Sequence, residues 1–211
     1  YDMYAWIMMS SLEDWTVISD WYLDKTYRRL EPNYEVRTIA DSIVTAGMTD
    51  KEKVVTIYNY ITKEINYSFV SFLNSNFIPK RPGSTCSAKI GDCKDVASLM
   101  ISMLRHVGIE SYYVLVKIRN FTAHQPVPSM WFDHVIVGYV LDGKMQYMDL
   151  TTDFYPYYAV HEGDSDAWAL LIKKGSNIAF HLLNDHLNPS KYLFDVEIQA
   201  KFGLDRSVYL E

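Results

Sequence analysis

Cys93 is one of only two cysteines in the chain, and it lies immediately before a run of residues with helical periodicity. At the start of a helix a thiol faces unpaired backbone amides and the positive end of the helix dipole, and both favour the thiolate over the thiol. A thiolate in this position can attack a carbonyl carbon. Cys93 also fits the phase of the helix's apolar stripe, so a buried structural cysteine is the alternative interpretation.

A nucleophilic thiolate needs a general base, and the base needs a third group to orient it. The dipeptide Asp142-Gly143 is a strong hairpin signal, and a two-residue turn there fixes the register of the flanking strands. In that register His134 and Asp149 are diagonal neighbours on one face, with Cα atoms about 7–8 Å apart and within reach of a hydrogen bond. A three-residue loop would instead place them on opposite faces.

His134 and Asp149 each interrupt an otherwise apolar strand. A lone histidine in such a strand is usually a satisfied core residue, but two interruptions on one face predict a functional pair. We therefore expect a Cys–His–Asp triad in which Asp149 holds the imidazole, His134 takes the thiol proton and Cys93 attacks the substrate. The backbone amide of Cys93 and a side chain from residues 65–72 are candidates for an oxyanion hole.

The same three side chains can in principle bind a metal ion. A single cysteine at a helix start beside a His–Asp pair suits nucleophilic catalysis better, so we expect neither a metal nor another cofactor. His161, Asp164 and Asp166 also carry ligand atoms. They lack the spacing of a calcium loop, and we expect them to form a solvated turn.

Four further residues near the triad have two interpretations each. Trp131, Phe132 and Tyr155 are close in sequence to the predicted base and its carboxylate, and they either wall a substrate cleft or cap the core. Cys86 either pairs with Cys93 in an oxidising compartment, which would silence the nucleophile, or is only a neighbour.

Two carboxylates, Asp92 and Asp95, flank the nucleophile. Asp95 in the first helical turn favours the helix dipole, and Asp92 is either the N-cap or a tie to the preceding loop. Their negative charge opposes thiolate formation, and the triad has to overcome it.

The elements that would position these residues follow from hydrophobic periodicity. Helices are expected from residue 11, over about 34–46 and over 49–65, where Thr49 and Glu52 fit a capping box. Residues 94–107 have the pattern of a helix packed deep in a core, and Gly108 suits its C-terminal cap. Strands are expected over 111–119, 132–140 and 144–150. This order predicts an α+β fold with N-terminal helices and a central helix packed on an antiparallel sheet.

The rest of the chain is expected to be loop or a further domain. Residues 68–90 carry Ser, Asn, Pro and Gly and predict a long surface loop. Residues 1–185 would form the core domain with its helical lead-in. Residues 186–211, which alternate in polarity and turn near Gly203, would start a second, β-rich domain. Because the chain begins with Tyr1, we expect it to be excised from a longer precursor.

Composition excludes several classes of protein. The 211 residues are 49% hydrophobic and 22% charged, which suits one well-packed core. The net charge of −6, without a basic cluster, argues against a nucleic-acid partner. No apolar run approaches ~18 residues, so no membrane span is expected.

Several motifs together resemble the transglutaminase-like superfamily. They are "GDCKD" opening an apolar helix that ends in "GIE", then "FDHVIV", and then the turn "LDGK" with "YMDLTTDFYP". The likeness covers about residues 49–160, and it is greatest to the bacterial branch whose core domain lies between β-rich domains in long, often exported proteins. The resemblance implies a papain-like core with Cys93 as nucleophile, His134 as base and Asp149 as the orienting carboxylate.

The resemblance implies acyl transfer on peptide or amide bonds through a thioester, and we expect hydrolysis rather than transamidation. The substrate would be a peptide or protein, the flanking β domains of the same precursor would be partners, and the location would be extracytoplasmic. The alternative is a catalytically inactive binding or scaffold module of a larger exported protein.

Overall fold

The structure, a computed structural model, describes residues 9–68, 77–118, 127–151, 155–161, 164 and 167–182, with the backbone alone at 181, 200–202 and 208–210. The helices are α1 (Thr16–Thr26), the 3-10 turn η1 (Tyr27–Arg29), α2 (Tyr34–Ile43), α3 (Asp50–Glu64), α4 (Pro82–Ala88) and α5 (Cys93–His106). The strands are β1 (Asn66–Tyr67), β2 (Ile90–Gly91), β3 (Ser111–Lys117), β4 (His134–Leu141), β5 (Lys144–Met148), β6 (Ala167–Leu171), β7 (Ala179–Leu182), β8 (Ala200–Phe202) and β9 (Val208–Leu210).

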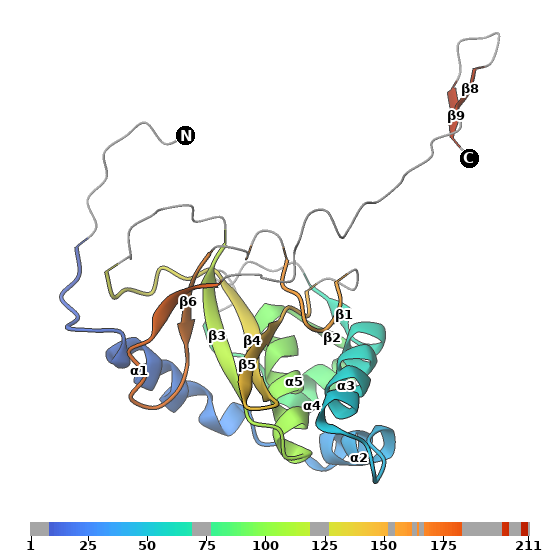
Figure 1. The fold of residues 1–211 in the computed structure, drawn as a ribbon, viewed down its shortest axis with the longest axis horizontal. Coiled ribbons are helices and arrows are strands. Elements are labelled where there is room, and N and C mark those ends of the chain that lie inside the picture. Colours follow the sequence, from blue (N-terminus) through green and yellow to red (C-terminus); the bar gives the residue numbers. More distant parts are fainter. Residues whose placement is uncertain are drawn as a thin grey trace.

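A five-stranded antiparallel sheet in the order β5-β4-β3-β6-β7 forms one layer of the molecule. The helix α5 lies along one face of this sheet and contacts β3 and β4, while α2, α3 and α4 pack on α5 (Figure 1). The predicted α+β fold, with a central helix on an antiparallel sheet, is confirmed.

The central helix is the most deeply buried element. Every residue from Cys93 to Leu104 is buried, so α5 is enclosed on all sides and not only along its apolar stripe. Tyr113 and Leu115 of β3 point into this main core, whereas Val114 and Val116, which alternate with them, join a second cluster on the other face. The alternation follows from the two-residue period of a strand.

The hairpin between β4 and β5 has the predicted register. Leu141 pairs with Lys144 and Val137 with Met148 across a two-residue turn. Asp142 and Gly143 have φ angles of 51° and 72°, the left-handed values that a type I′ hairpin turn requires. This turn decides which face of the sheet each following side chain joins.

The helix boundaries agree with prediction where capping signals are present. Thr49 and Glu52 form the reciprocal capping box at the start of α3, and Gly108, with φ of 86°, follows the end of α5. The first helix begins at Thr16 rather than at residue 11, and the second ends at Ile43 rather than near 46.

The prediction of an uninterrupted loop over residues 68–90 is wrong. Residues 82–88 form α4, with Pro82 at its first turn, where the missing amide costs no hydrogen bond. Ile90 and Gly91 form β2, which pairs in parallel with β1. The short helix was missed because its sequence, PGSTCSA, has turn-forming residues and no apolar period. Strands β6 and β7 were not predicted either.

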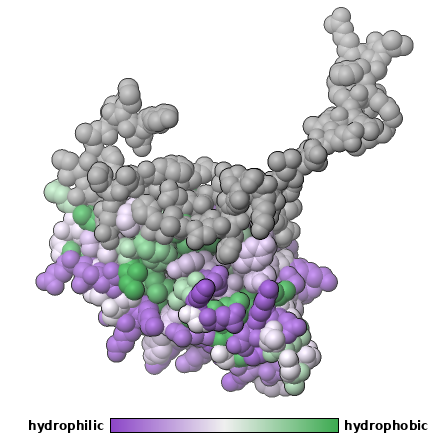
Figure 2. Space-filling model, in the orientation of Figure 1, coloured by the Kyte–Doolittle hydropathy of each residue, from purple (hydrophilic) through white to green (hydrophobic). Residues whose placement is uncertain are grey.

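The segments on either side of the turn expected near Gly203 pair antiparallel, as β8 (Ala200–Phe202) and β9 (Val208–Leu210). The division into domains at residue 185 stays a prediction. No helix in the described part of the chain has the length and apolarity to cross a membrane. The visible surface of the described residues is mainly hydrophilic, with smaller hydrophobic patches among the polar side chains (Figure 2).

Candidate active site

The capping of α5 fixes the position of the cysteine. Asp92 is the N-cap of this helix and accepts a hydrogen bond from the amide of Asp95 at 3.2 Å, while the Asp95 carboxylate accepts one from the amide of Asp92. Cys93 is therefore the first helical residue, where backbone amides lack partners within the helix. Its side chain is only 2% exposed.

The two flanking carboxylates also hold neighbouring positive charges. Lys94 is buried and forms an ion pair with Asp92. Asp95 accepts a hydrogen bond from the Lys80 amide at 2.7 Å and forms an ion pair with the Lys80 ammonium at 3.2 Å. Both carboxylates are thus compensated by caps and cations, which reduces the opposition to thiolate formation that the sequence led us to expect.

The base and its carboxylate come from the β4–β5 hairpin. His134 is the first residue of β4, opposite Val116 of β3, and Asp149 directly follows the last residue of β5. His134 Nε2 lies 3.1 Å from Asp149 Oδ2 in a buried hydrogen bond. The contact predicted from the hairpin register is therefore present.

Asp149 is fixed by a second residue, Thr151. The Thr151 amide donates to Asp149 Oδ1 and its hydroxyl to Oδ2, both at 2.9 Å. Burial acts to raise the pKa of Asp149, but the charge of His134 and hydrogen bonds with His134, Asp164 and Thr151 outweigh it and lower that pKa to about 2. Asp149 is therefore a carboxylate at neutral pH.

The imidazole joins the cysteine to the carboxylate. Burial acts to lower the pKa of His134, but the charges of Asp149 and Asp164 and hydrogen bonds with Asp149 and Cys93 raise it well above its usual value. Because Nε2 faces Asp149, Nδ1 is the nitrogen left for the thiol. Cys93, His134 and Asp149 are thus brought together in the order that a nucleophile, a base and an orienting acid require.

A second buried carboxyl, Asp164, lies beside this pair. The expectation that Asp164 lies in a solvated turn is wrong, because this residue is only 1% exposed. Its Oδ2 atom lies 3.7 Å from Nε2 of His134. His161 is half-buried with its ring 5.5 Å from that of Tyr155, and Asp166 lies outside the described residues. No local pattern marks Asp164, because it reaches the site through the long-range pairing of β6 with β3.

Tyr67 of β1 is a residue that the sequence analysis did not name, although it lies in the 65–72 stretch. Burial raises the pKa of its phenol, and the nearby charges of Cys93, Asp149, Asp92 and Asp164 raise it further. Tyr67 therefore keeps its proton and remains a hydrogen-bond donor close to the nucleophile. The parallel pairing of Tyr67 with Gly91 brings it near Cys93, two residues further along the chain.

The three aromatic residues proposed for the substrate cleft lie in different surroundings. Phe132 is buried in the main core with its ring 5.7 Å from Trp15, so its side chain is part of the core and not of a cleft wall. Trp131 is half-buried, with the Lys117 ammonium 5.4 Å from its ring. Tyr155 is half-buried and its carbonyl accepts a hydrogen bond from Tyr58 at 2.7 Å. Contact of Trp131 or Tyr155 with a substrate stays a prediction.

Both cysteines are free thiols. Cys86 lies in α4, and burial together with Glu35 raises its pKa despite a hydrogen bond with Tyr60. Cys86 is therefore a poorer nucleophile than an ordinary thiol, which makes it a suitable internal control for Cys93.

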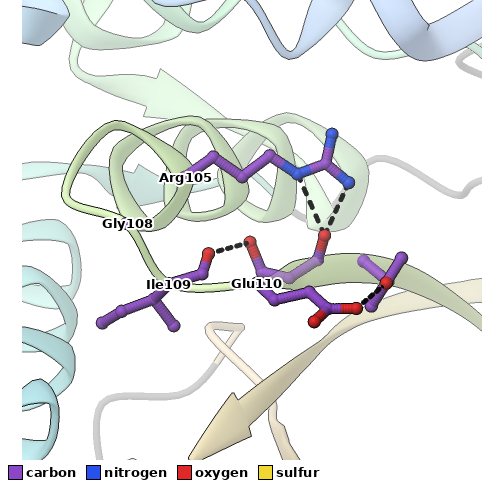
Figure 3. Close-up of a pocket in the computed structure, with 6 residues that line it drawn as sticks. Arg105, Gly108, Ile109 and Glu110 are labelled. Carbon is purple, nitrogen blue, oxygen red and sulfur yellow. Dashed lines mark hydrogen bonds between the residues drawn. The ribbon is translucent and has the colours of Figure 1, made fainter.

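The described surface also has a cavity of about 440 Å³, at the opposite end of α5 from Cys93. Its six lining residues run from Arg105 to Tyr112 around the α5–β3 turn (Figure 3). Arg105 donates two hydrogen bonds to the Ser111 carbonyl, and Glu110 accepts one from Tyr112. Both charged side chains therefore already have hydrogen-bond partners, and Cys93, His134 and Asp149 remain the candidate active site.

His134, Asp149 and Asp164 each offer a ligand atom within 4.8 Å of the others. Two carboxyls can lie this close together without a metal ion if protons balance their charge. A protonated His134 balances one carboxylate, and a proton on the second carboxyl makes it neutral.

A cysteine at the start of a buried helix, packed on an antiparallel sheet that carries a His–Asp pair, defines the papain-like class of fold. The profile described as "Transglutaminase-like superfamily" matches residues 37–169, more than half of the chain. The chain therefore belongs to the transglutaminase-like superfamily.

Two solved structures are similar to this chain. A "putative protease" from Parabacteroides distasonis has a TM-score of 0.59 and 17% identity, over 78% of this chain and 31% of that one. A "putative cysteine protease" from Cytophaga hutchinsonii has a TM-score of 0.44 and 21% identity, over 59% of this chain and 41% of that one. The chain thus spans less than half the length of either. No curated protein matches it significantly.

Proposed function

We propose that the protein is a cysteine-dependent acyl-transfer enzyme that acts on peptide or amide bonds through a thioester. The observation that carries this proposal is the buried chain of contacts from Cys93 through His134 to Asp149. Membership of the superfamily supports the fold and the triad, but not one particular reaction.

In the first half of the reaction, Cys93 Sγ attacks the carbonyl carbon of the substrate while His134 takes the thiol proton. The tetrahedral oxyanion accepts hydrogen bonds from the Cys93 amide and from the Tyr67 hydroxyl. His134 then returns the proton to the leaving amine as the carbon–nitrogen bond breaks. Asp149 stays ionised throughout and holds the imidazole.

In the second half, water attacks the thioester and gives its proton to His134. The carbon–sulfur bond breaks, a carboxylic acid leaves, and the proton returns to Cys93 Sγ. Hydrolysis is proposed ahead of transamidation because an acceptor site for an amine has to exclude water, and the described residues contain no recognisable site of this kind. A peptide or protein substrate and an extracytoplasmic location are further proposals, and the location rests on the resemblance alone.

The second candidate function, an inactive binding module, is favoured by one observation. Cys93 is 2% exposed and His134 is 5% exposed, so the nucleophile is covered. A substrate can reach Sγ only if the segments around the site move. The two functions differ in whether Cys93 is a reactive thiolate at neutral pH.

The pH dependence of iodoacetamide alkylation tests the proposal, with each cysteine followed by peptide mass spectrometry. An activated Cys–His pair predicts rapid labelling of Cys93 well below pH 8, slowed at least tenfold in His134→Ala. Cys86 in the same sample is the control, because its raised pKa predicts slow labelling throughout. Labelling of Cys93 that rises only near pH ~8.5, and is unchanged in the variant, would establish the inactive module instead.

A further inference from the structure

Asp164 is a buried acid that the triad mechanism does not use. Its backbone is anchored by hydrogen bonds from its amide to the His161 carbonyl at 2.9 Å and from the Ala167 amide to its own carbonyl at 3.2 Å. Its side chain is 1% exposed, and neither carboxyl oxygen accepts a hydrogen bond from any of the described residues. An isolated buried carboxylate is costly, so the position calls for a physical explanation.

The surroundings of Asp164 explain which form of the acid is present. Four titratable residues lie near Asp164. They are His134 at the start of β4, Asp133 directly before it, Asp149 directly after β5, and Tyr67 of β1. If both Asp149 and Asp164 were ionised beside one imidazolium, the buried group would carry a net negative charge. Two buried carboxyls this close therefore keep one proton between them.

The hydrogen bonds decide which acid keeps that proton. Asp149 accepts two hydrogen bonds from Thr151 and one from His134, all of which stabilise a carboxylate. Asp164 accepts none of this kind, and its Oδ2 is further from His134 Nε2, at 3.7 Å against 3.1 Å. Burial, and then the charge of Asp149, raise the pKa of Asp164 well above its usual value in spite of the attraction of His134. The proton belongs on Asp164.

We propose that Asp164 is a positioning residue that remains a neutral carboxylic acid at pH 7 and donates its hydrogen bond to the carboxylate of Asp149. This inference deepens the proposed function, on which it rests. Asp164 would act on His134 only through Asp149, and it gains and loses no proton during turnover. With Asp164 neutral, a single carboxylate, Asp149, balances the imidazolium that forms when His134 takes the proton of Cys93 Sγ, and the buried acids do not prevent His134 from releasing that proton to the leaving amine.

The charge balance sets the direction of the effect. If Asp164 were ionised, two carboxylates would hold the proton on His134, and release of that proton to the leaving amine would be slowed. If the side chain were removed, Asp149 would lose a donor and the imidazole would be less firmly oriented. The neutral acid form of Asp164, which donates a hydrogen bond and carries no charge, therefore suits the site best.

Asp164→Asn and Asp164→Ala separate these possibilities, because asparagine copies the neutral acid with its donor while alanine removes both. The rate of Cys93 alkylation between pH 5 and 9 is measured for each, with Asp133→Asn as the matched control. Asp133 also lies near His134, but it is partly exposed and paired with Lys117. We expect Asp164→Asn to label within about twofold of the wild type at pH 7 and Asp164→Ala to be about tenfold slower.

A direct readout of the proton comes from the carboxyl carbon signal in protein labelled with ¹³C at aspartate, assigned by its absence in Asp164→Asn. The proposal expects the chemical shift of a protonated acid at pH 7. An ionised shift, an asparagine variant as slow as alanine, or an alanine variant as fast as the wild type would each overturn it. A wild type with an unreactive Cys93 would instead refute the proposed function, while the carboxyl signal would still test the proton on Asp164.

Discussion

At the residue scale, the triad depends on how firmly Asp149 is held. Thr151 supplies two of its hydrogen bonds, one from the backbone and one from the side chain. A carboxylate with fewer donors is less stable in its ionised form and orients the imidazole less well. Thr151 is therefore as much a part of the site as the residues whose chemistry is visible in the sequence.

Replacing Thr151 with valine removes the hydroxyl donor and keeps both the shape and the amide donor. We expect the free energy of unfolding to fall by about 1–2 kcal/mol, because the lost hydrogen bond is to a buried charge. A loss of about 1 kcal/mol in the His–Asp pair would slow alkylation of Cys93 roughly fivefold. Urea unfolding and the alkylation rate at pH 7 measure the two effects.

Thr38→Val is the matched control, because the Thr38 hydroxyl donates to the Tyr34 carbonyl on an exposed face of α2. Its effect on stability should stay within about 0.5 kcal/mol and its effect on alkylation should be nil. Equal effects of the two substitutions would show that Thr151 has no special role in the site.

At the element scale, the start of α5 combines capping with charge compensation. Asp92 caps the helix and also pairs with Lys94, which is 2% exposed. Asp92→Ala should therefore cost about 3–5 kcal/mol, well above the ~1 kcal/mol of a lost cap, because a buried ammonium loses this carboxylate. Thr49→Ala, at the exposed capping box of α3, is the control and should cost only ~1 kcal/mol. Urea unfolding compares them, and similar losses in both variants would remove the ion pair from the explanation.

The elements that could be predicted from sequence are those fixed by local signals. The central helix has an apolar period and a glycine C-cap, and the β4–β5 register follows from the Asp142-Gly143 turn alone. The contact between His134 and Asp149 is a consequence of that turn, and so it could also be predicted.

The elements that could not be predicted depend on distant parts of the chain. Strand β6 reads "AWALL" and is buried along its whole length, so it has no alternation to mark it as a strand. Asp164 precedes β6 and is buried only because β6 pairs with β3 in the centre of the sheet. Tyr67 approaches Cys93 through the parallel pairing of β1 with β2, which no local pattern indicates.

At the scale of the whole molecule, the two carboxyls beside His134 should affect stability in opposite directions as the pH changes. The folded-state pKa of Asp149 is about 2, below the ~3.9 of an unfolded aspartate, so its contribution is present above pH ~3.9 and is lost as the pH falls toward 2. The folded-state pKa of Asp164 is raised, so its proton stabilises the fold below pH ~3.9, and that contribution is lost as the pH rises toward the raised value.

Asp149→Asn and Asp164→Asn are therefore a matched pair for urea unfolding at several pH values. The stability advantage of the wild type over Asp149→Asn should grow from pH 2 to 4. Asp164→Asn should gain on the wild type from pH 4 upward, by at most about 1.4 kcal/mol per pH unit. Parallel pH profiles for the two variants would mean that the carboxyls share one protonation state.

The covered nucleophile gives a last prediction for the whole molecule. Cys93 and Cys86 are 2% and 4% exposed, so both must be uncovered before a reagent reaches them. In an enzyme, a local opening at the site uncovers Cys93 and leaves the core intact, so its labelling rate should be nearly independent of urea below the unfolding transition. Cys86 is packed in the main core, and its labelling should rise with urea as steeply as unfolding does. The same steep rise for both cysteines would mean that Cys93 is reached only by unfolding, which an inactive module tolerates and an enzyme cannot.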